Sequence, residues 1–198
     1  LDQWYSPART RYVIPERFNA ASMSMMGPVK QIELTGMHQS DRLESNGAVP
    51  EGDRLTVNGI QTNGVVSKNG RYSFGMAGYE KGSLSGRNGH NALDAFRTGP
   101  YVLMDTIGGK LYYESYYISG ALTFPWRKST FGMGLDYKAQ NAYRKLDPRV
   151  QSTVSDFSMH LSLMRQMGEY FVGIGAQTGR YSQNVSSRNY RPDRKDYV

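Results

Sequence analysis

The residues best suited to chemistry are the three histidines and the carboxylates near them. His160 and Asp156 fall on one side of an extended segment, four residues apart, which separates them by about 13 Å at ~3.3 Å per residue. A catalytic dyad would therefore need a partner from another segment, and no nucleophile with a positioned base is marked in the sequence. We expect His160 to belong to a polar row, and we expect no enzymatic activity and no catalytic residue.

A metal site finds equally little support. His38 and His90 lie at or in predicted loops, and acidic residues follow His38. These residues are Asp41, Glu44, Glu51 and Asp53. Their spacing matches neither an EF-hand nor a zinc site, and the absence of cysteine excludes thiolate ligands, cysteine nucleophiles and disulfides. We expect solvated loop charge and no bound metal.

Two further motifs have simpler explanations than a cofactor. The Gly-x-Gly pairs at 132/134 and 173/175 lie in the middle of extended segments with no helix after them, so they do not match a nucleotide-binding loop. Met23, Met25 and Met26 could offer thioether ligands, but hydrophobic packing is the better interpretation. We expect no cofactor.

The net charge of +7 raises the possibility of a nucleic-acid partner. The basic residues are scattered over predicted turns and loops, with no basic helix and no binding motif. We therefore expect no nucleic acid and consider instead that basic loop residues on a cell-surface rim meet anionic lipid head groups.

The strongest pattern is a regular succession of extended segments and connections of two sizes. Alternating residues predict strands over 29–39, 54–66, 71–81, 111–124, 129–140, 153–165 and 169–181. The connections 67–70, 125–128 and 166–168 are short, whereas 40–53, 82–110, 141–152 and the stretch from 182 to 198 are long. Outer-membrane barrels sort their loops in this way, with short periplasmic turns and long extracellular loops.

Side chains alternate between the two faces of a strand, so each predicted strand presents one apolar and one polar face. The residues expected to face lipid are Phe131, Met133, Leu135, Phe157, Met159, Leu161, Val172 and Ile174. Those expected to line a polar lumen are Asp136, Lys138, Asp156, Ser158, His160 and Gln177. An aromatic girdle at the membrane interfaces is expected from Tyr72, Phe124, Trp126, Tyr170 and Tyr181.

The predicted fold is all-β, an antiparallel up-and-down transmembrane β-barrel. Residues 1–28 form a lead-in segment and residues 29–198 form part of the barrel; a soluble sandwich or a lipocalin-like barrel is the alternative. Seven strands are an odd number, whereas single-chain bacterial barrels have an even number. We therefore expect this chain to be the N-terminal portion of a longer barrel.

The stretch from Tyr112 to Tyr143 contains a Phe124-Pro125-Trp126-Arg127 turn, a Gly132-x-Gly134-x-Asp136-Tyr137 return strand and an Asn141-Ala142-Tyr143 exit. Lys145, Asp147, Pro148 and Arg149 follow it, and Asn19-Ala20-Ala21 precedes the first strand. With these motifs the chain resembles an uncharacterised Bacteroidota-type outer-membrane β-barrel family. The resemblance implies an outer-membrane location and an association with uptake by TonB-dependent receptors, and it implies no catalytic residues.

Three functions remain open at this stage. The protein is expected to act in solute transport or as an accessory subunit of a surface uptake complex, with outer-membrane lipid, lipopolysaccharide and a TonB-dependent receptor as partners. The first alternative is a structural or adhesive barrel whose long loops bind a protein partner. The second is an outer-membrane hydrolase.

Overall fold

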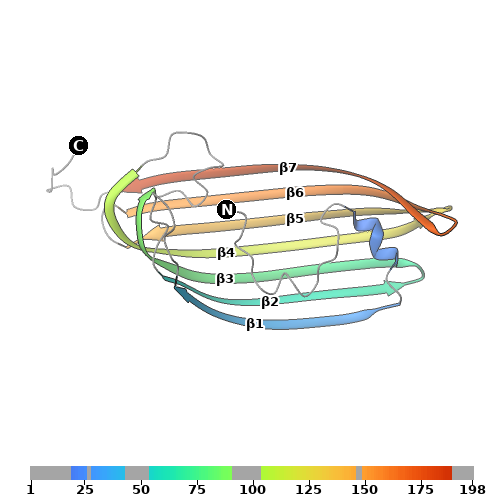
Figure 1. The fold of residues 1–198 in the computed structure, drawn as a ribbon, viewed down its shortest axis with the longest axis horizontal. Helices are drawn as coiled ribbons and strands as arrows, with labels where there is room; N and C mark the ends of the chain where they lie inside the picture. The colour runs from blue at the N-terminus through green and yellow to red at the C-terminus, as the bar shows by residue number, and fades with distance from the viewer. Residues whose placement is uncertain (1–18, 26–27, 43–53, 91–103, 146–148, 189–198) are drawn as a thin grey trace.

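The computed structural model describes residues 19–25, 28–42, 54–90, 104–145 and 149–188. These residues form one short 3-10 helix, η2 (Ala20–Met25), and seven strands, shown in Figure 1. The strands are β1 (Lys30–Arg42), β2 (Arg54–Lys68), β3 (Arg71–His90), β4 (Met104–Trp126), β5 (Ser129–Arg144), β6 (Arg149–Met167) and β7 (Tyr170–Arg188). No helix among the described residues is long and apolar enough to cross a membrane.

All seven strands belong to one antiparallel sheet in the order β1 to β7, so each strand pairs with its neighbours in the chain. The all-β class and the up-and-down topology are therefore confirmed. Among the described strands, β1 and β7 form the two edges and do not pair with each other. The sheet is open, and closure into a barrel stays a prediction.

The short connections lie where the sequence predicts them. The turn between β2 and β3 is Asn69-Gly70, with positive φ angles of 54° and 72° at the two residues. Asn-Gly suits such a turn because both residues tolerate the left-handed region. Arg127 and Gly168, in the other two short turns, also have positive φ angles.

Three of the predicted long connections are wrong in extent, and in one of them β7 continues past 182 to Arg188. β3 and β4 continue into 82–110, where Leu84 pairs with Leu111 and Gly89 pairs with Asp105 across register shifts. β5 and β6 continue to the pair Tyr143 and Gln151, which leaves 145–148 between them in place of the expected 141–152. Backbone hydrogen bonds hold these glycine-rich and polar extensions, so apolar alternation does not reveal them.

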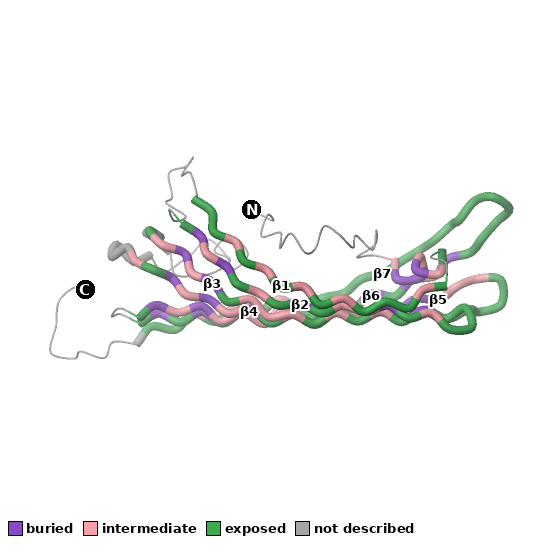
Figure 2. The backbone as a smooth tube through the Cα atoms, turned by 90° about the horizontal axis from the view of Figure 1, so that it is seen from below, coloured by how far each residue is buried: buried purple, intermediate pink, exposed green. Residues whose placement is uncertain are grey.

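The sheet has two distinct faces. We call the face on which η2 packs the inner face and the opposite one the outer face; Figure 2 shows the sheet curving toward the side of η2. At the end of the long connections, the inner face carries an apolar cluster of buried side chains. This cluster consists of Leu55, Val57, Leu84, Leu111, Tyr113 and Ala142, with Met37 packed against it.

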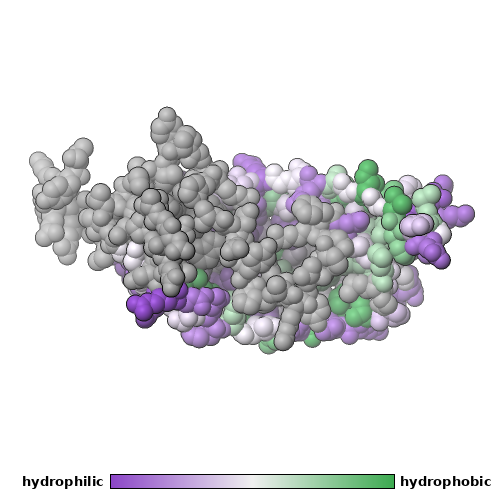
Figure 3. Space-filling model, viewed as in Figure 1, coloured by the Kyte–Doolittle hydropathy of each residue, from purple (hydrophilic) through white to green (hydrophobic). Residues whose placement is uncertain are grey.

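A second apolar cluster lies at the short-turn end, beneath η2. Ala20 and Met23 pack there against Tyr72, and hydrophobic residues gather at this end in the view of Figure 3. The backbone N–H of Ala21 donates a 3.0 Å hydrogen bond to the Ser162 hydroxyl. A Cβ at Gly132 would lie 2.2 Å from the Ala21 nitrogen, so η2 docks closely only because this position is glycine.

Candidate functional site

The outer face carries a band of apolar side chains that is fullest on β4, β5 and β6 and is interrupted by Thr62, Ser73 and Arg180 on the flanking strands. In one row across the sheet, Leu34, Ile118, Tyr137 and Phe157 occupy positions that are aligned by the strand register. Rows closer to the short turns contain Leu122, Met133 and Leu161, and then Phe124, Phe131, Leu163 and Ile174. Most of these side chains are exposed, and Ile174 is 72% exposed. A large apolar surface of this kind marks an interaction with lipid or protein.

The band ends sharply on the side of the long connections. Tyr79 and Tyr116 contact each other at its margin, with ring centroids 4.9 Å apart. The next row on the outer face is polar throughout. It consists of His38, Asn58, Lys81, Glu114, Asn141, Thr153 and Asn184.

The inner face is polar at the level where the outer face is apolar. Between the two apolar clusters lie hydroxyl, amide and charged side chains from β2 to β7. They include Gln61, Ser115, Tyr117, Ser119, Asp136, Lys138, Gln140, Asp156, Ser158, His160 and Gln177. Asp136 lies between Leu135 and Tyr137 of the outer band. Neighbouring residues of one strand therefore belong to a polar face and an apolar face in turn.

The structure places the residues singled out from the sequence as follows. The six residues expected to be polar and lumen-facing all lie on the inner face, and the eight expected to face lipid all lie on the outer face. Phe124, Trp126 and Tyr170 are exposed on the outer face. Tyr181 lies on the inner face, in register with Asp156.

Tyr72 and Tyr181 do not fit the expected girdle, because both lie on the inner face. Tyr72 is only 8% exposed and packs against Ala20 and Met23. In β3 the aromatic residues Tyr72 and Phe74 share the inner face with the η2 contacts, because the alternation is out of phase with the other strands. Alternation separates two faces but does not say which one points outward.

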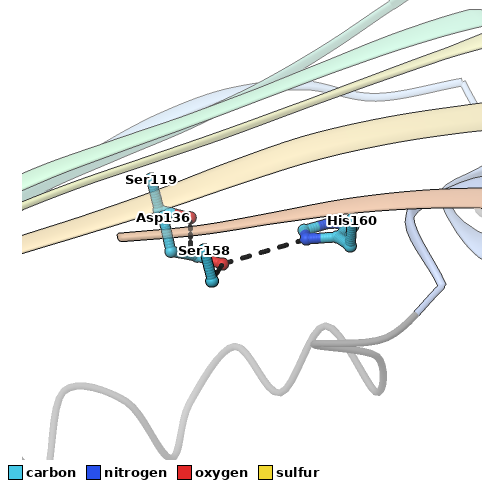
Figure 4. A network of polar contacts seen from close by, with 4 residues as sticks. All are labelled: Ser119, Asp136, Ser158 and His160. Carbon is cyan, nitrogen blue, oxygen red and sulfur yellow. Dashed lines mark hydrogen bonds and ion pairs between the residues drawn. The ribbon is translucent and has the colours of Figure 1, made fainter. Parts of the chain in front are cut away.

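Three polar side chains of the inner face come together around the carboxylate of Asp136, as Figure 4 shows. The Ser119 hydroxyl donates a 2.5 Å hydrogen bond to Asp136 Oδ1, and the Ser158 hydroxyl lies 3.4 Å from Asp136 Oδ2. His160 Nδ1 lies 3.9 Å from Asp136 Oδ2. The His160 ring is 5% exposed and occupies the space above Gly134, where a Cβ would lie 2.2 Å from its Nε2.

This cluster contains the residue types of a hydrolase triad without the triad arrangement. In a triad, the histidine accepts the proton of the serine nucleophile and is oriented by the carboxylate. Here both serines donate to Asp136, and His160 Nδ1 has no hydrogen-bond partner among the described residues. The geometry is that of a polar wall, in which Asp136 is held by two hydroxyls.

The sequence analysis found Asp136, Ser158 and His160 but missed Ser119 and the pairing across strands. His160 meets Asp136 of β5, not Asp156 of its own strand. The partner depends on the register between β5 and β6, in which Gly134 faces His160 and Asp136 faces Ser158. Only the position of the short turn at 127–128, which sets the register between β4 and β5, could have pointed to Ser119.

Other hydrogen bonds extend the polar wall sideways. The Tyr117 hydroxyl donates to Gln61 at 3.2 Å, and Gln140 donates to the Ser115 hydroxyl at 2.8 Å. Gln183 of β7 donates to the Ser152 hydroxyl of β6 at 3.0 Å. The polar wall therefore includes residues of five strands. It presents many hydrogen-bond donors and acceptors and no single reactive group among the described residues.

No group of three or more His, Asp or Glu side chains among the described residues could hold a metal ion. His38 contacts Asn58 on the outer face, with 2.7 Å between Nδ1 and Oδ1. Glu44, Glu51, Asp53 and the side chain of His90 lie outside the described part of the chain.

On the loop side of the apolar band, Lys81 and Glu114 form an ion pair with 3.1 Å between Nζ and Oε1. The hydrogen bond to Glu114 and the charge of that carboxylate raise the pKa of Lys81. Farther along β4, on the inner face, burial raises the pKa of the Tyr113 hydroxyl. Both groups keep their usual protonation at neutral pH.

No curated protein and no solved structure matches the chain. A family whose description is "Family of unknown function (DUF6850)" matches residues 41–198. The match covers every described strand except most of β1, and it includes the Asp136 cluster and the outer apolar band apart from the β1 residues of that band. The chain belongs to this family of unknown function (DUF6850).

Proposed function

We propose that this sheet is part of the wall of an outer-membrane β-barrel that acts in solute transport or as an accessory subunit of a surface uptake complex. The observation that carries the proposal is the opposition of the two faces over the same stretch of strand. Lipid-spanning barrels need an apolar exterior and have a polar interior. The inner wall around Asp136 would then line the lumen, and the protein would have no catalytic function.

The height of the apolar band agrees with this placement. On β4 the outer face is apolar from Tyr116 to Trp126, apart from Gly120, a stretch of about 33 Å at ~3.3 Å per residue. Strands of such barrels tilt by about 35–45°, which gives a vertical extent of about 25 Å, the height of the apolar belt in outer-membrane barrels. Trp126 and Tyr116, at its two ends, are residue types that favour the membrane interfaces.

Site-directed spin labelling of the full-length protein in lipid vesicles tests the proposal. The 198 residues contain no cysteine, so single cysteines can be introduced at Leu135 and Leu161 on the outer face and at Ser158 on the inner face. Labels at the two leucines should be relaxed by oxygen, which dissolves in lipid, and the label at Ser158 by a water-soluble nickel complex. Equal access to the nickel complex at all three positions would contradict a membrane-facing outer surface.

Orientation is tested separately. An epitope tag inserted in the connection 91–103 should be detected on intact cells, whereas one in the turn at Asn69 should need permeabilised cells. Surface detection at Asn69 would reverse the expected orientation while leaving the barrel proposal intact.

A partner-binding barrel is the second candidate, and the length of β3 and β4 favours it. These strands have 20 and 23 residues, whereas about 9–11 suffice to cross a bilayer. The excess lies on the side of the long connections and would project from the membrane as a platform for a protein partner. Ion conductance in planar bilayers separates the candidates, because a transport pore conducts and a plugged or purely adhesive barrel does not.

A further inference from the structure

A compact group of aromatic and basic side chains lies on the outer face beyond the apolar band. The rings of Tyr112 and Tyr143 stack with centroids 5.7 Å apart and an interplanar angle of 19°. Lys145 Nζ lies 4.6 Å and Lys110 Nζ 5.4 Å from the centre of the Tyr112 ring. The tyrosine pair thus gathers two ammonium groups at one point of the rim.

A hollow of about 480 Å³ adjoins this group between β5 and β6. Tyr143 and Lys145 line it on one side, and Arg149 and Gln151 on the other. Asn141 also lines it and accepts a 3.0 Å hydrogen bond from Gln151. The hollow therefore presents cationic and amide groups around a recess large enough for a phosphate and the sugar or glycerol that bears it.

The charge balance and the height of the group indicate its partner. Glu114, the outer-face carboxylate nearest to it along β4, is engaged by Lys81 at 3.1 Å. Tyr112 lies four residues beyond Tyr116, the margin of the apolar band, so the group stands about 10 Å above the band once strand tilt is included. The head-group region adds about 5–8 Å on each side of the hydrocarbon core, and lysine and arginine side chains at this height are long enough to reach phosphates within that region.

We propose that Lys110, Lys145 and Arg149, gathered around the Tyr112–Tyr143 stack, bind the phosphate groups of an anionic lipid of the surrounding leaflet. The acyl chains of that lipid would lie along the apolar band below. Each basic residue near such a surface adds to lipid affinity, and arginine binds phosphate with two parallel hydrogen bonds. The proposal rests on the membrane placement argued above and adds a specific lipid site to it.

The test compares two doubly substituted forms of the full-length protein, K110Q/K145Q and K68Q/R71Q. Both remove two positive charges from exposed positions of the outer face, but Lys68 and Arg71 lie at the short-turn end. Binding of diphosphorylated lipid A is measured by native mass spectrometry and by titration in detergent micelles. We expect K110Q/K145Q to bind about 10- to 30-fold more weakly and K68Q/R71Q to bind as the unmodified protein does.

Dephosphorylated lipid A and inorganic phosphate serve as separate arms of the titration. The site should prefer the diphosphorylated lipid to both. Unchanged affinity in K110Q/K145Q would overturn the proposal, as would equal binding of free phosphate. Spin-label accessibility at Leu135 is measured in the same variants: if that position remains in lipid while lipid A binding is unaffected, the lipid site fails and the barrel proposal stands.

Discussion

The two faces of this sheet are built from the same strands, but apolar and polar side chains occupy opposite positions along the strands on the two faces. On the outer face the apolar side chains lie in the middle of the strands, and the polar row of Lys81 and Glu114 lies toward the end. On the inner face the middle is polar around Asp136, and the apolar clusters lie at the two ends. A soluble sandwich would bury one apolar face against a second sheet; here the apolar face is the exposed one.

The comparison shows that burial does not follow hydrophobicity in this chain: some polar side chains are buried, and many large apolar ones are exposed. The most deeply buried residues include Ser115, Ser152 and Ser162, at 1–3% exposure, whereas Ile32 is 81% exposed. Buried serines find hydrogen-bond partners nearby, as Ser115 does with Gln140 on the same wall and Ser162 does with Ala21 of η2. Within the part of the chain that the structure describes, no element covers the apolar band, and burial of its side chains would remove apolar surface from water.

A charge placed on each face gives the largest expected contrast. Leu135→Arg and Leu161→Arg should each lower the free energy of unfolding by about 2–4 kcal/mol, because the charge would lie near the middle of the bilayer. Ser158→Arg should be tolerated, since the new guanidinium would lie on the polar wall near Asp136. Urea titration of the full-length protein folded into lipid vesicles measures the difference, and equal losses at all three positions would remove the distinction between the faces.

A methyl group under η2 should have the next largest effect. Gly132→Ala places its Cβ against the backbone of Ala21, so η2 must shift or detach, at a cost of about 1–3 kcal/mol. Hydrogen exchange at residues 19–25 should increase. Gly75→Ala is the matched control, because nothing lies within 4 Å of a Cβ there, and a similar increase in that variant would show that η2 does not depend on the glycine.

Removal of one hydroxyl should have the smallest effect. Ser119→Ala should cost about 1 kcal/mol through its hydrogen bond to Asp136, whereas Ser73→Ala on the exposed outer face should cost almost nothing. A double-mutant cycle with Asp136→Asn isolates the interaction. Additive effects of Ser119→Ala and Asp136→Asn would mean that the hydroxyl and the carboxylate do not support each other.

The sequence predicts the strands, the short turns and the assignment of residues to two faces, since each follows from alternation over a few neighbouring residues. It does not predict the extension of β3 and β4 beyond Leu84 and Leu111, where the strands stay paired across two register shifts. It also places Tyr72 on the wrong face, because no pattern within β3 indicates that η2 packs against Tyr72. These features depend on contacts between distant segments.

The candidate site shows the same division. Single residues such as Asp136 and His160 are recognisable from their place in an otherwise apolar strand. Their mutual contact is not, because it depends on which residue of β5 stands opposite which residue of β6. Predicting it requires both the register and the space that Gly134 leaves for the imidazole.

The odd number of strands in this sheet restricts which strands can pair with its two edges. Neighbouring strands run in opposite directions throughout, so β1 and β7 point the same way, and a direct bond between them would be a parallel pair. A second copy in the same membrane orientation, related by an axis along the membrane normal, would also pair β7 with β1 in parallel. A barrel that is antiparallel all round must therefore insert an odd number of further strands between β7 and β1.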